Sequence, residues 1–409
     1  MCLDKRPLYP DLPDRASPQK ADMANTTADA MDPKTIETQT MITALKGTVI
    51  RVPNLYGILK GWPVKANINY KRLIPVIENT FDRYFLQTVY LEKLRLTSYC
   101  KIRLVKPSKL REKYRKANYA RFVSLYYPHP EWDQVRILAL YIIWLFCWDD
   151  AIDQQGTSDL SNDILHAKAH RDNTIKVLEH SLGLAPPKTK LSFELQNANP
   201  ELKVIGDKLQ MAYSLEQRQT FMTQMRRYID NCHEEQKMRL QGTLPDIESY
   251  SDLRHGTAAV WTLCALIEYG LSDNIPKDIR RMGQMQTIWS ETSRAIWITN
   301  DILSLRKEIP KEGSESIVNA IPILMQHKGI SPQQAVDDLL AELATSVTVF
   351  EEAAGILEES AGKGGQELMK TYCDACRCMV TGSIQFTLES SRYKLEGCLN
   401  EDGSLDILL

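Results

Sequence analysis

Apolar residues recur at helical spacing along most of the chain, from about residue 70 to residue 390. This pattern predicts helices over residues 136–150, 214–240, 246–270, 277–307 and 367–396, and a further helix that begins at Ser331-Pro332. Ser before the helix and Pro at its first position are typical of a helix start. No run of alternating apolar residues indicates a sheet. The pattern therefore predicts an all-α protein.

The N-terminal part of the chain differs from the rest. Residues 1–48 are rich in Pro, Asp, Lys and Thr and show little apolar periodicity, which predicts a disordered tail. Within residues 49–409 the one candidate boundary is 183–200, whose composition is that of a surface connection and not of a linker between two cores. We therefore expect a single helical domain over residues 49–409.

Composition narrows the class of partner and the compartment. The net charge of −2 shows no basic excess of the kind that nucleic-acid binding requires. The longest apolar stretch, Ile137–Trp148, is too short to span a bilayer, and the first residues contain no apolar run typical of a signal peptide. Nine scattered cysteines without framework spacing suggest reduced thiols. We expect a cytoplasmic protein with no membrane span and no nucleic-acid partner.

Candidate chemistry begins at the end of the apolar helix, where Asp149, Asp150 and Asp153 follow one another. Asp149 and Asp153 are four residues apart, so a helix places them on one face, where the two carboxylates repel. A bound cation relieves that repulsion, and oxygen ligands without nearby His or Cys suit Mg²⁺. A solvated helix end with chance acids is an equal alternative for this motif by itself.

A second set of oxygen ligands lies further along the chain. Asn300, Ser304 and Glu308 are spaced by four residues, and each such step turns a helix by about 40°, so the three side chains form one stripe. An amide, a hydroxyl and a carboxylate together make a hard-oxygen site of low charge. An exposed polar stripe is the alternative, and it becomes weaker because another metal motif exists elsewhere in the chain.

Taken together, the Asp149-Asp150-x-x-Asp153 and Asn300-Asp301-x-x-Ser304-x-x-Lys307-Glu308 motifs resemble the paired metal motifs of class I terpene cyclases. The segment from Arg51 to Gly57 and the Arg-Tyr pair at 392–393 are similar to fungal sesquiterpene cyclases of the presilphiperfolanol-synthase-like group. The resemblance runs from about residue 50 to residue 396. It implies a class I terpenoid synthase helical bundle around a central active-site cleft, and a lyase of isoprenoid secondary metabolism. Prenyl diphosphate synthases carry two Asp-rich motifs, and this chain has one.

The resemblance also implies a role for each matching residue. Asp149 and Asp153 would bind two Mg²⁺ ions, and Asn300, Ser304 and Glu308 would bind a third. Near residue 254, the P-x-x-x-x-Y-x-x-x-R segment is similar to the one that carries the family's diphosphate-sensing arginine. The implied diphosphate residues are the sensor Arg254, the linker Thr257, Ala258 with its carbonyl toward the ionising carbon, Lys307, Arg392 and Tyr393. An arginine fork suits phosphate because it donates two parallel hydrogen bonds and stays charged.

The substrate pocket should be apolar and aromatic, since aromatic faces stabilise a carbocation and exclude water. Phe146 and Trp297, about one turn before the metal ligands, are the expected substrate contacts, and Ile296, Phe386 and Leu388 are further candidates. Ordinary core packing is an equal alternative for each aromatic residue. The resemblance implies farnesyl diphosphate as substrate. A cyclase for geranylgeranyl diphosphate and a non-catalytic prenyl-binding helical protein remain alternatives, as do a monomer and a homodimer.

Overall fold

The computed structural model describes residues 40–93, 107–153, 159–192, 195, 199–310 and 317–409, with the backbone alone at 84–93, 107–110, 153 and 159. Helices dominate the described chain, which confirms the all-α prediction. The helices are α2 (Leu55–Ile58), α3 (Tyr70–Lys93), α4 (Pro107–Lys116), α5 (Tyr119–Tyr126), α6 (Trp132–Asp153), α7 (Ile164–Ser181), α9 (Pro200–Ala212), α10 (Leu215–Gln241), α11 (Ile247–Thr257), α12 (Val260–Cys264), α13 (Ile267–Leu271), α14 (Lys277–Arg280), α15 (Gly283–Glu308), α16 (Ala320–Lys328), α17 (Pro332–Ser360) and α18 (Gly362–Glu389), with the 3₁₀ turns η1 (Asp159–Asn162) and η2 (Ser391–Tyr393).

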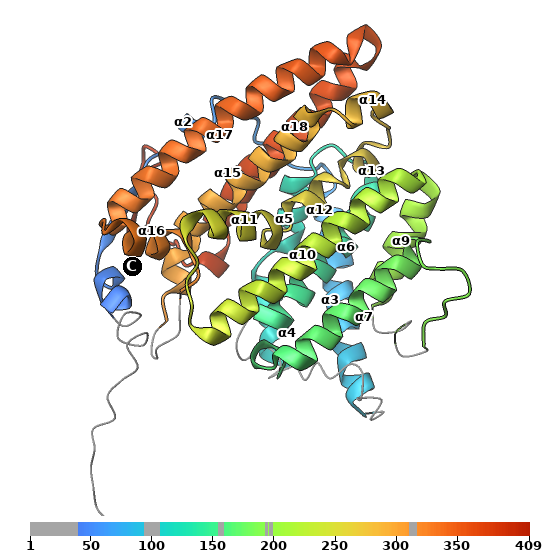
Figure 1. Cartoon of the computed structure of the whole chain (residues 1–409), viewed down its shortest axis with the longest axis horizontal. Helices are drawn as coiled ribbons and strands as arrows, with labels where there is room; N and C mark the ends of the chain where they lie inside the picture. Colours follow the sequence, from blue (N-terminus) through green and yellow to red (C-terminus); the bar gives the residue numbers. More distant parts are fainter. Residues whose placement is uncertain (1–39, 94–106, 154–158, 193–194, 196–198, 311–316) are drawn as a thin grey trace, which may run out of the picture.

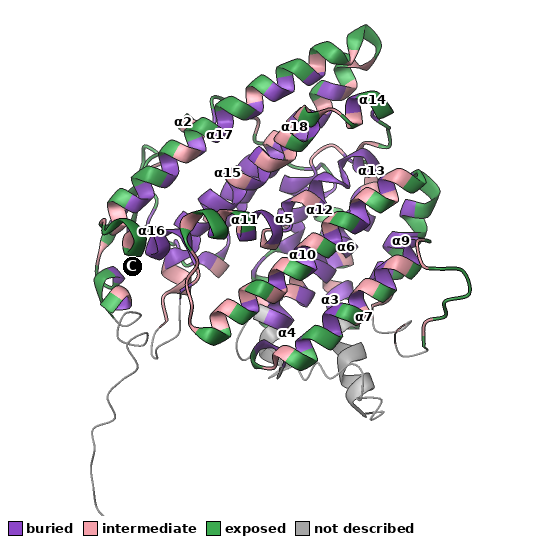
Figure 2. Ribbon diagram, in the orientation of Figure 1, coloured by how far each residue is buried: buried purple, intermediate pink, exposed green. Residues whose placement is uncertain are grey.

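The helices form a bundle with a buried centre (Figure 1). Helix α15 packs against α17 and α18, α18 against α5, and α10 against α11 and α7. Figure 2 shows that α5, α6, α12 and α15 are largely buried, whereas α7, α10 and α17 each present an exposed outer face. Between Ile137 and Trp148, helix α6 is apolar on nearly all sides, as a helix in the middle of a bundle must be, and Asp149, Asp150 and Asp153 follow at its C-terminal end. No helix in the described part of the chain has both the length and the apolarity to cross a membrane.

Three of the predicted helices differ from the observed ones. The helix predicted over 277–307 consists of α14 and α15, which are separated at Met282, whose backbone is extended (φ −64°, ψ 144°). The segment predicted as one helix over 246–270 consists of α11, α12 and α13, and the first break lies at Ala259, whose φ of 58° is left-handed. Helix α18 ends at Glu389 and not at 396, because Ser390 is extended and caps η2. Arg392 and Tyr393 therefore lie in a 3₁₀ turn beside the helix bundle.

The two ends of the described chain meet in a small sheet that the sequence pattern did not predict. Strand β1 (Val49–Val52) pairs antiparallel with β2 (Leu405–Leu408), with Val49 opposite Leu408. Strands of four residues are too short to show a period, and their partners are distant in sequence. Residues 40–45 are helical, and Ile42 and Leu45 are buried. The described fold thus begins inside the tail predicted for residues 1–48, of which 1–39 lie outside the described residues.

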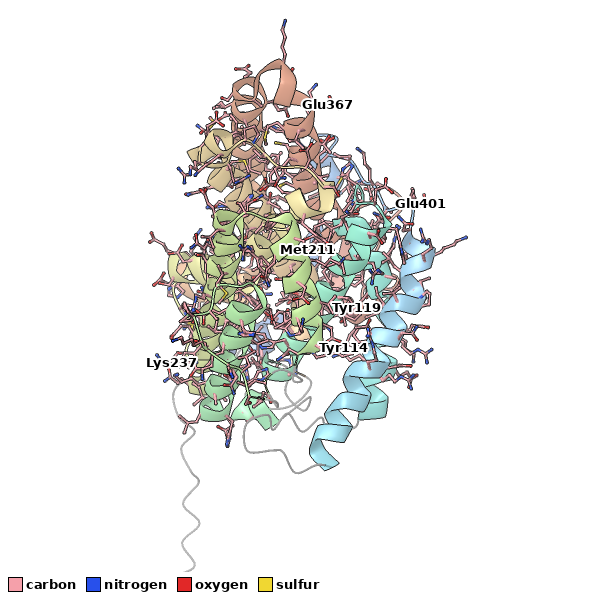
Figure 3. The ribbon with its side chains drawn as sticks, turned by 90° about the vertical axis from the view of Figure 1, so that its right-hand side faces the viewer. Tyr114, Tyr119, Met211, Lys237, Glu367 and Glu401 are labelled. Atoms are coloured by element: carbon pink, nitrogen blue, oxygen red, sulfur yellow. The ribbon has the colours of Figure 1, made fainter. Side chains whose placement is uncertain are left out.

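Helix α4 is joined to α5 through aromatic packing. Tyr114 near the end of α4 and Tyr119 at the start of α5 are both buried and lie close together in the view turned by 90° (Figure 3). Their ring centroids are 5.8 Å apart, edge to face, and Phe81 of α3 stacks on Tyr114 at 5.0 Å. These contacts fix the described side chains of α4 next to the acidic end of α6.

Candidate active site

The acidic end of α6 separates two neighbouring carboxylates. Asp149 faces α10, where its Oδ1 accepts a hydrogen bond of 2.8 Å from the Tyr228 hydroxyl. Burial and the adjacent Asp150 raise the pKa of Asp149 to about 7. Asp153 is the last residue of α6, and its side chain lies outside the part of the chain that the structure describes. An acid that is destabilised in its charged form is suited to a cation as partner.

Asp150 faces the opposite way, toward η2. Arg392 donates to it through both terminal nitrogens, at 3.1 Å to Oδ1 and 3.4 Å to Oδ2. Burial raises the pKa of Asp150, but the Arg392 charge and its hydrogen bond outweigh this and hold the pKa below its usual value. Lys113 of α4 lies 4.0 Å from Asp150 Oδ2. Asp150 thus anchors the Arg-Tyr turn to the metal-motif helix.

The Asn300, Ser304 and Glu308 stripe lies on the last turns of α15, as the spacing predicts. Asn300 Oδ1 accepts from Arg254 at 3.2 Å, and Glu308 Oε2 accepts from Asn319 at 3.0 Å. Between them, the buried Ser304 Oγ has no hydrogen-bond partner among the described residues. Leaving a buried hydroxyl unpaired costs about 1–3 kcal/mol, so a ligand for that oxygen would stabilise the site. The all-oxygen donor set and the unpaired hydroxyl fit a hard divalent cation.

No three His, Cys, Asp or Glu side chains in the described chain gather into a metal-sized cluster. The residues expected to bind metal do not meet this criterion. Asn300 and Ser304 are not among the four residue types, and the Asp153 side chain lies outside the described part of the chain.

Arg254 is held between α11 and α15. Its Nη2 lies 2.9 Å from Asp301 Oδ1, and its Nη1 donates to Thr257 Oγ1 at 3.3 Å. Asp301 is buried and also accepts from the Tyr250 hydroxyl at 2.5 Å and the Ala320 amide at 3.0 Å. The structure therefore brings Arg254, Thr257 and Asn300 together, with Asp301 as the anchor that sequence reasoning did not single out.

Glu235 of α10 is a second residue that sequence reasoning missed. Burial raises its pKa, whereas the nearby Arg254 charge and a hydrogen bond with Thr257 lower it. The same carboxylate contributes to the raised pKa of Asp149, so it lies between the two candidate metal motifs. Tyr228 and Glu235 are seven residues apart on α10, two helical turns on one face. That spacing was the available signal that Glu235 lies on the same helix face as Tyr228, although nothing in the sequence alone gives Glu235 a function.

Lys307, Arg392 and Tyr393 also come together. The Lys307 Nζ lies 5.0 Å from the centroid of the buried Tyr393 ring. The Arg392 guanidinium lies 6.0 Å from the centroid of Phe146, and its Nη1 is 3.4 Å from the Tyr119 hydroxyl oxygen. The three residues thus converge near the end of α6 that carries Asp150.

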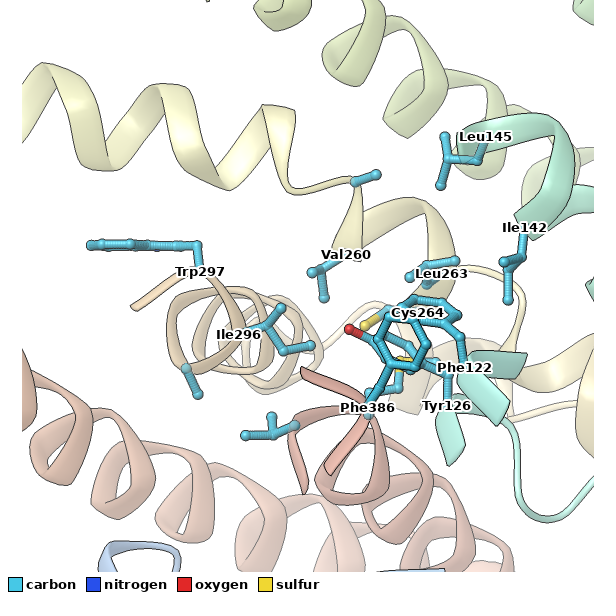
Figure 4. Packing of buried hydrophobic residues seen from close by; sticks show 14 of the residues in the cluster. Phe122, Tyr126, Ile142, Leu145, Val260, Leu263, Cys264, Ile296, Trp297 and Phe386 are labelled. Atoms are coloured by element: carbon cyan, nitrogen blue, oxygen red, sulfur yellow. The ribbon is translucent and has the colours of Figure 1, made fainter. Parts of the chain in front are cut away.

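A cluster of aromatic side chains lies next to these charged groups. Phe122 stacks on Tyr126 at 3.9 Å and contacts Phe146 at 5.0 Å and Phe386 at 5.1 Å edge to face. Figure 4 shows Phe122, Tyr126 and Phe386 together, with apolar side chains of α12 nearby. Phe146 and Phe386, both named from the sequence, belong to this aromatic cluster.

Trp297, the other aromatic residue expected to contact the substrate, lies apart from this aromatic cluster. Its ring projects away from Phe122 and Tyr126 (Figure 4) and packs against Tyr250 and His255 of α11, at 6.2 and 6.5 Å. Successive helix positions differ by about 100°, so Trp297 and the neighbouring Ile296 point to different sides of α15.

Comparison with known proteins identifies the family and the fold. Residues 140–348 match the family described as terpene synthase family 2, C-terminal metal binding. The chain belongs to this family, and it is a class I terpene synthase, a lyase that uses divalent metal. The aligned region includes both metal motifs and Arg254, whereas Arg392 and Tyr393 lie beyond it.

Two curated fungal relatives cover nearly the whole chain. The sesquiterpene cyclase hepA of Aspergillus oryzae is 29% identical over 368 residues, which are 88% of this chain and 93% of that protein. The terpene cyclase braA of Annulohypoxylon truncatum is 24% identical over 393 residues, 92% of this chain and 94% of that protein. This similarity supports a terpene cyclase.

Solved structures share the fold at low sequence identity. Germacradien-4-ol synthase from Streptomyces citricolor superposes with a TM-score of 0.62 at 16% identity, covering 79% of this chain and 95% of that chain. The SVS_A2 protein from ancestral sequence reconstruction superposes with a TM-score of 0.62 at 17% identity, covering 84% and 90%. These matches confirm the helical class I fold.

Proposed function

We propose that the protein is a sesquiterpene cyclase that ionises farnesyl diphosphate with the help of Mg²⁺ and closes the carbocation to a cyclic hydrocarbon or alcohol. The observation that carries this proposal is the buried, unpaired Ser304 hydroxyl between Asn300 and Glu308, beside Arg254. The name of the Aspergillus oryzae relative supports the C15 substrate. We also propose the presilphiperfolanol-synthase-like group, a single cyclase domain over 49–409 and a cytoplasmic location.

In this proposal the metal residues divide between two helices. Asp149 and Asp153 of α6 would hold two Mg²⁺ ions, and Asn300, Ser304 and Glu308 of α15 would hold a third. When bound, the metal ions neutralise the diphosphate oxygens and make the diphosphate a better leaving group.

Arg254, Lys307, Arg392 and Tyr393 are proposed to bind the diphosphate. Asp301 fixes the Arg254 guanidinium against α15, so less side-chain freedom is lost when the arginine meets a phosphate. Arg392 is similarly fixed by Asp150. Positive groups placed in advance stabilise the negative charge that develops on the diphosphate oxygen as the carbon–oxygen bond breaks.

The end of α11 is proposed to face the cation that remains. Helix α11 ends at Thr257, Ala258 is its C-cap, and Ala259 turns the chain out of the helix. The last carbonyl groups of a helix lack helical partners and carry partial negative charge. In our proposal the Ala258 carbonyl stabilises the allylic cation, and Thr257 links Arg254 to Glu235.

The aromatic cluster is proposed to form a wall of the substrate pocket. The faces of Phe146, Phe122 and Phe386 can each stabilise a nearby cation by about 0.5–2 kcal/mol. Their apolar surface also excludes water from the intermediates. Loss of a proton yields a hydrocarbon and capture of a water molecule yields an alcohol, and the proposal includes both outcomes.

The test is product formation from defined substrates. Purified protein is incubated with Mg²⁺ and either farnesyl or geranylgeranyl diphosphate, and the extract is analysed by gas chromatography–mass spectrometry. We expect a cyclic C15 product. A cyclic C20 product alone would make the protein a diterpene cyclase, and no product from either substrate would support a non-catalytic prenyl-binding protein.

The second metal motif is tested separately. We expect Asn300→Ala to abolish turnover, because it removes a metal ligand and a partner of Arg254, while the far-ultraviolet circular dichroism stays unchanged. Asn400→Ala, at an exposed site in the C-terminal segment, is the control and should retain activity. A fully active Asn300→Ala variant would remove the second metal site from the proposal.

A further inference from the structure

Helix α16 begins beside the last turns of α15, and its first residues contact the second metal motif. Asn319 is the N-cap of α16, and its side-chain oxygen accepts a hydrogen bond of 3.0 Å from the Ile321 amide. Asn319 is buried and lies outside the motifs identified from the sequence. The Ala320 amide donates to Asp301 Oδ2 at 3.0 Å. The start of α16 is thus tied to α15.

The amide nitrogen of Asn319 makes two further hydrogen bonds, both to α15. It donates to the main-chain carbonyl of Asp301 at 2.9 Å and to Glu308 Oε2 at 3.0 Å. A side-chain amide has one oxygen and two N–H groups, so the oxygen and both N–H groups of Asn319 are in use. Capping a helix requires only the oxygen, which Ser, Thr or Asp could also supply. The amide nitrogen therefore has a role that the cap does not explain.

Glu308, the acceptor of one of these bonds, is the last residue of α15. The partial negative charge of a helix C-terminus disfavours a carboxylate there, and a side chain at a helix end rotates freely unless another group holds it. The other oxygen, Glu308 Oε1, lies 3.9 Å from Lys307 Nζ, beyond hydrogen-bond distance. Among the described residues, Asn319 is therefore the hydrogen-bond partner that fixes this carboxylate, whose side chain remains 30% exposed and accessible to an ion.

Asn319 can orient Glu308 only if Asn319 is itself held in place. The Ile321 amide holds its oxygen, and the Asp301 carbonyl holds its nitrogen. Both partners are main-chain groups, one in α16 and the other in α15, and groups fixed on helices are more precisely placed than groups on loops. The Glu308 carboxylate is thus attached through Asn319 to the bodies of two helices.

We propose that Asn319 is a positioning residue of the second metal motif, which holds the Glu308 carboxylate in the orientation that binds the cation. This inference rests on the proposed role of Glu308 as a metal ligand. The hydrogen bond to Oε2 leaves Oε1 for the cation and removes rotational freedom that the side chain would otherwise lose on binding. Partners that orient metal ligands in this way contribute about 10–100-fold to metal affinity or activity.

The competing role for Asn319 is purely structural, as the cap of α16 and a link to α15. Asn67 offers a matched comparison, because it is a buried asparagine with the same pattern of hydrogen bonds. Its oxygen accepts from the Asn69 amide at 2.9 Å, and its nitrogen donates to the carbonyls of Tyr127 and Pro130 at 3.0 and 2.7 Å. Asn67 thus reproduces the structural bonds of Asn319, but both acceptors of its nitrogen are main-chain carbonyls and neither is a carboxylate.

The experiment compares Asn319→Ser with Asn67→Ser in Mg²⁺ binding and in stability. Ser still caps α16, but it lacks the amide nitrogen that reaches Glu308. Inorganic diphosphate is titrated calorimetrically into each protein at a series of Mg²⁺ concentrations, which gives the Mg²⁺ concentration for half-maximal diphosphate binding. We expect Asn319→Ser to raise this concentration by about tenfold or more and Asn67→Ser to leave it unchanged, although both lower the midpoint of thermal unfolding. Turnover of farnesyl diphosphate by Asn319→Ser should recover as the Mg²⁺ concentration is increased.

An unchanged Mg²⁺ requirement in folded Asn319→Ser would overturn the inference. An equal shift in Asn67→Ser would overturn it as well, because the effect would then follow from lost stability alone. If Ser prevents folding, Asn319→Thr also caps a helix, fills more of the space and is compared in the same way. A wild-type protein that binds no diphosphate, or binds it equally well without Mg²⁺, would instead overturn the proposed function.

Discussion

Two adjacent carboxylates at the end of α6 have opposite electrostatic surroundings. Asp149 is half-buried beside another acid and, among the described residues, accepts a hydrogen bond from the hydroxyl of Tyr228, whereas Asp150 is buried and paired with Arg392. The pKa of Asp149 is therefore raised and that of Asp150 is lowered, although their side chains start one residue apart. Asp149 is therefore suited to bind a cation from solution, whereas the charge of Asp150 is already paired with that of Arg392.

Metal affinity should depend on pH through Asp149. Its folded-state pKa of about 7 lies above the ordinary value, so the carboxyl is neutral below that pH and must lose a proton to bind Mg²⁺. We expect the apparent Mg²⁺ affinity to fall by up to about tenfold for each pH unit below 7, and to be nearly constant above pH 8. Titrations of Mg²⁺ at pH 6 and pH 8 measure this. Equal affinities at the two pH values would contradict the role of Asp149.

The Arg254–Asp301 pair should matter for stability as well as for activity. The Asp301 side chain is buried, at 3% exposure, and the Arg254 side chain is only 14% exposed, so Asp301→Asn would leave a largely buried cation without its partner. We expect a loss of about 3–5 kcal/mol in the free energy of unfolding. The control is Asp406→Asn, which breaks the exposed pair with Arg51 and should cost about 0–1 kcal/mol. Urea unfolding of both variants tests the contrast, and similar losses would refute it.

At the residue scale the sequence was sufficient to name side chains that spacing or a family pattern marks. Asn300, Ser304 and Glu308 lie on one helix, so their common face could be predicted from the sequence. Asp301 and Glu235 could not be assigned in this way. Their partners belong to other helices, and no periodicity connects α10 with the end of α6 or α15.

The break between α11 and α12 shows that the extent of a whole helix also could not be predicted from the sequence where contacts with other helices matter. Ala258 and Ala259 are good helix formers, so the sequence predicted a continuous helix over 246–270. One local and one tertiary hydrogen bond accompany the break: the Thr262 hydroxyl donates to the Ala259 carbonyl at 2.7 Å, and the Tyr141 hydroxyl of α6 donates to Thr262 Oγ1 at 2.6 Å. Helices marked by a capping box, such as α10 and α17, begin where the sequence predicted.

The close approach of α10 and α11 depends on a glycine. A Cβ added at Gly256 would lie 2.6 Å from Asn231 Cβ, so Gly256→Ala should push α11 away from α10 and displace Arg254 and Thr257. We expect a loss of about 1–3 kcal/mol in stability and a larger loss of turnover. Gly355→Ala on α17, where a Cβ meets nothing within 4 Å, should instead stabilise the protein by about 0.5–1 kcal/mol.

Unfolding in urea and product yield measure both glycine variants. If Gly256→Ala were as stable as Gly355→Ala and equally active as wild type, the packing of α10 on α11 would not control the position of Arg254.

At the scale of the whole molecule, the β1–β2 sheet joins the two ends of the described chain. Neighbouring residues of β2 point to opposite sides: Ile407 is fully buried and Leu408 is 51% exposed. We expect Ile407→Ala to cost about 2–5 kcal/mol and Leu408→Ala to change stability by less than about 0.5 kcal/mol. Thermal unfolding monitored by circular dichroism compares the two. Equal effects would mean that the sheet does not pack on the core as described.

The same sheet constrains the order of events when the chain first folds. Val49 and Leu408 pair although about 360 residues separate them, and contacts of such long range form late. On the ribosome, β1 must remain without its partner strand until residues 405–408 have been synthesised. During that interval its backbone edge is open to pairing with other chains, so nascent protein should be most prone to aggregation just before its last strand emerges.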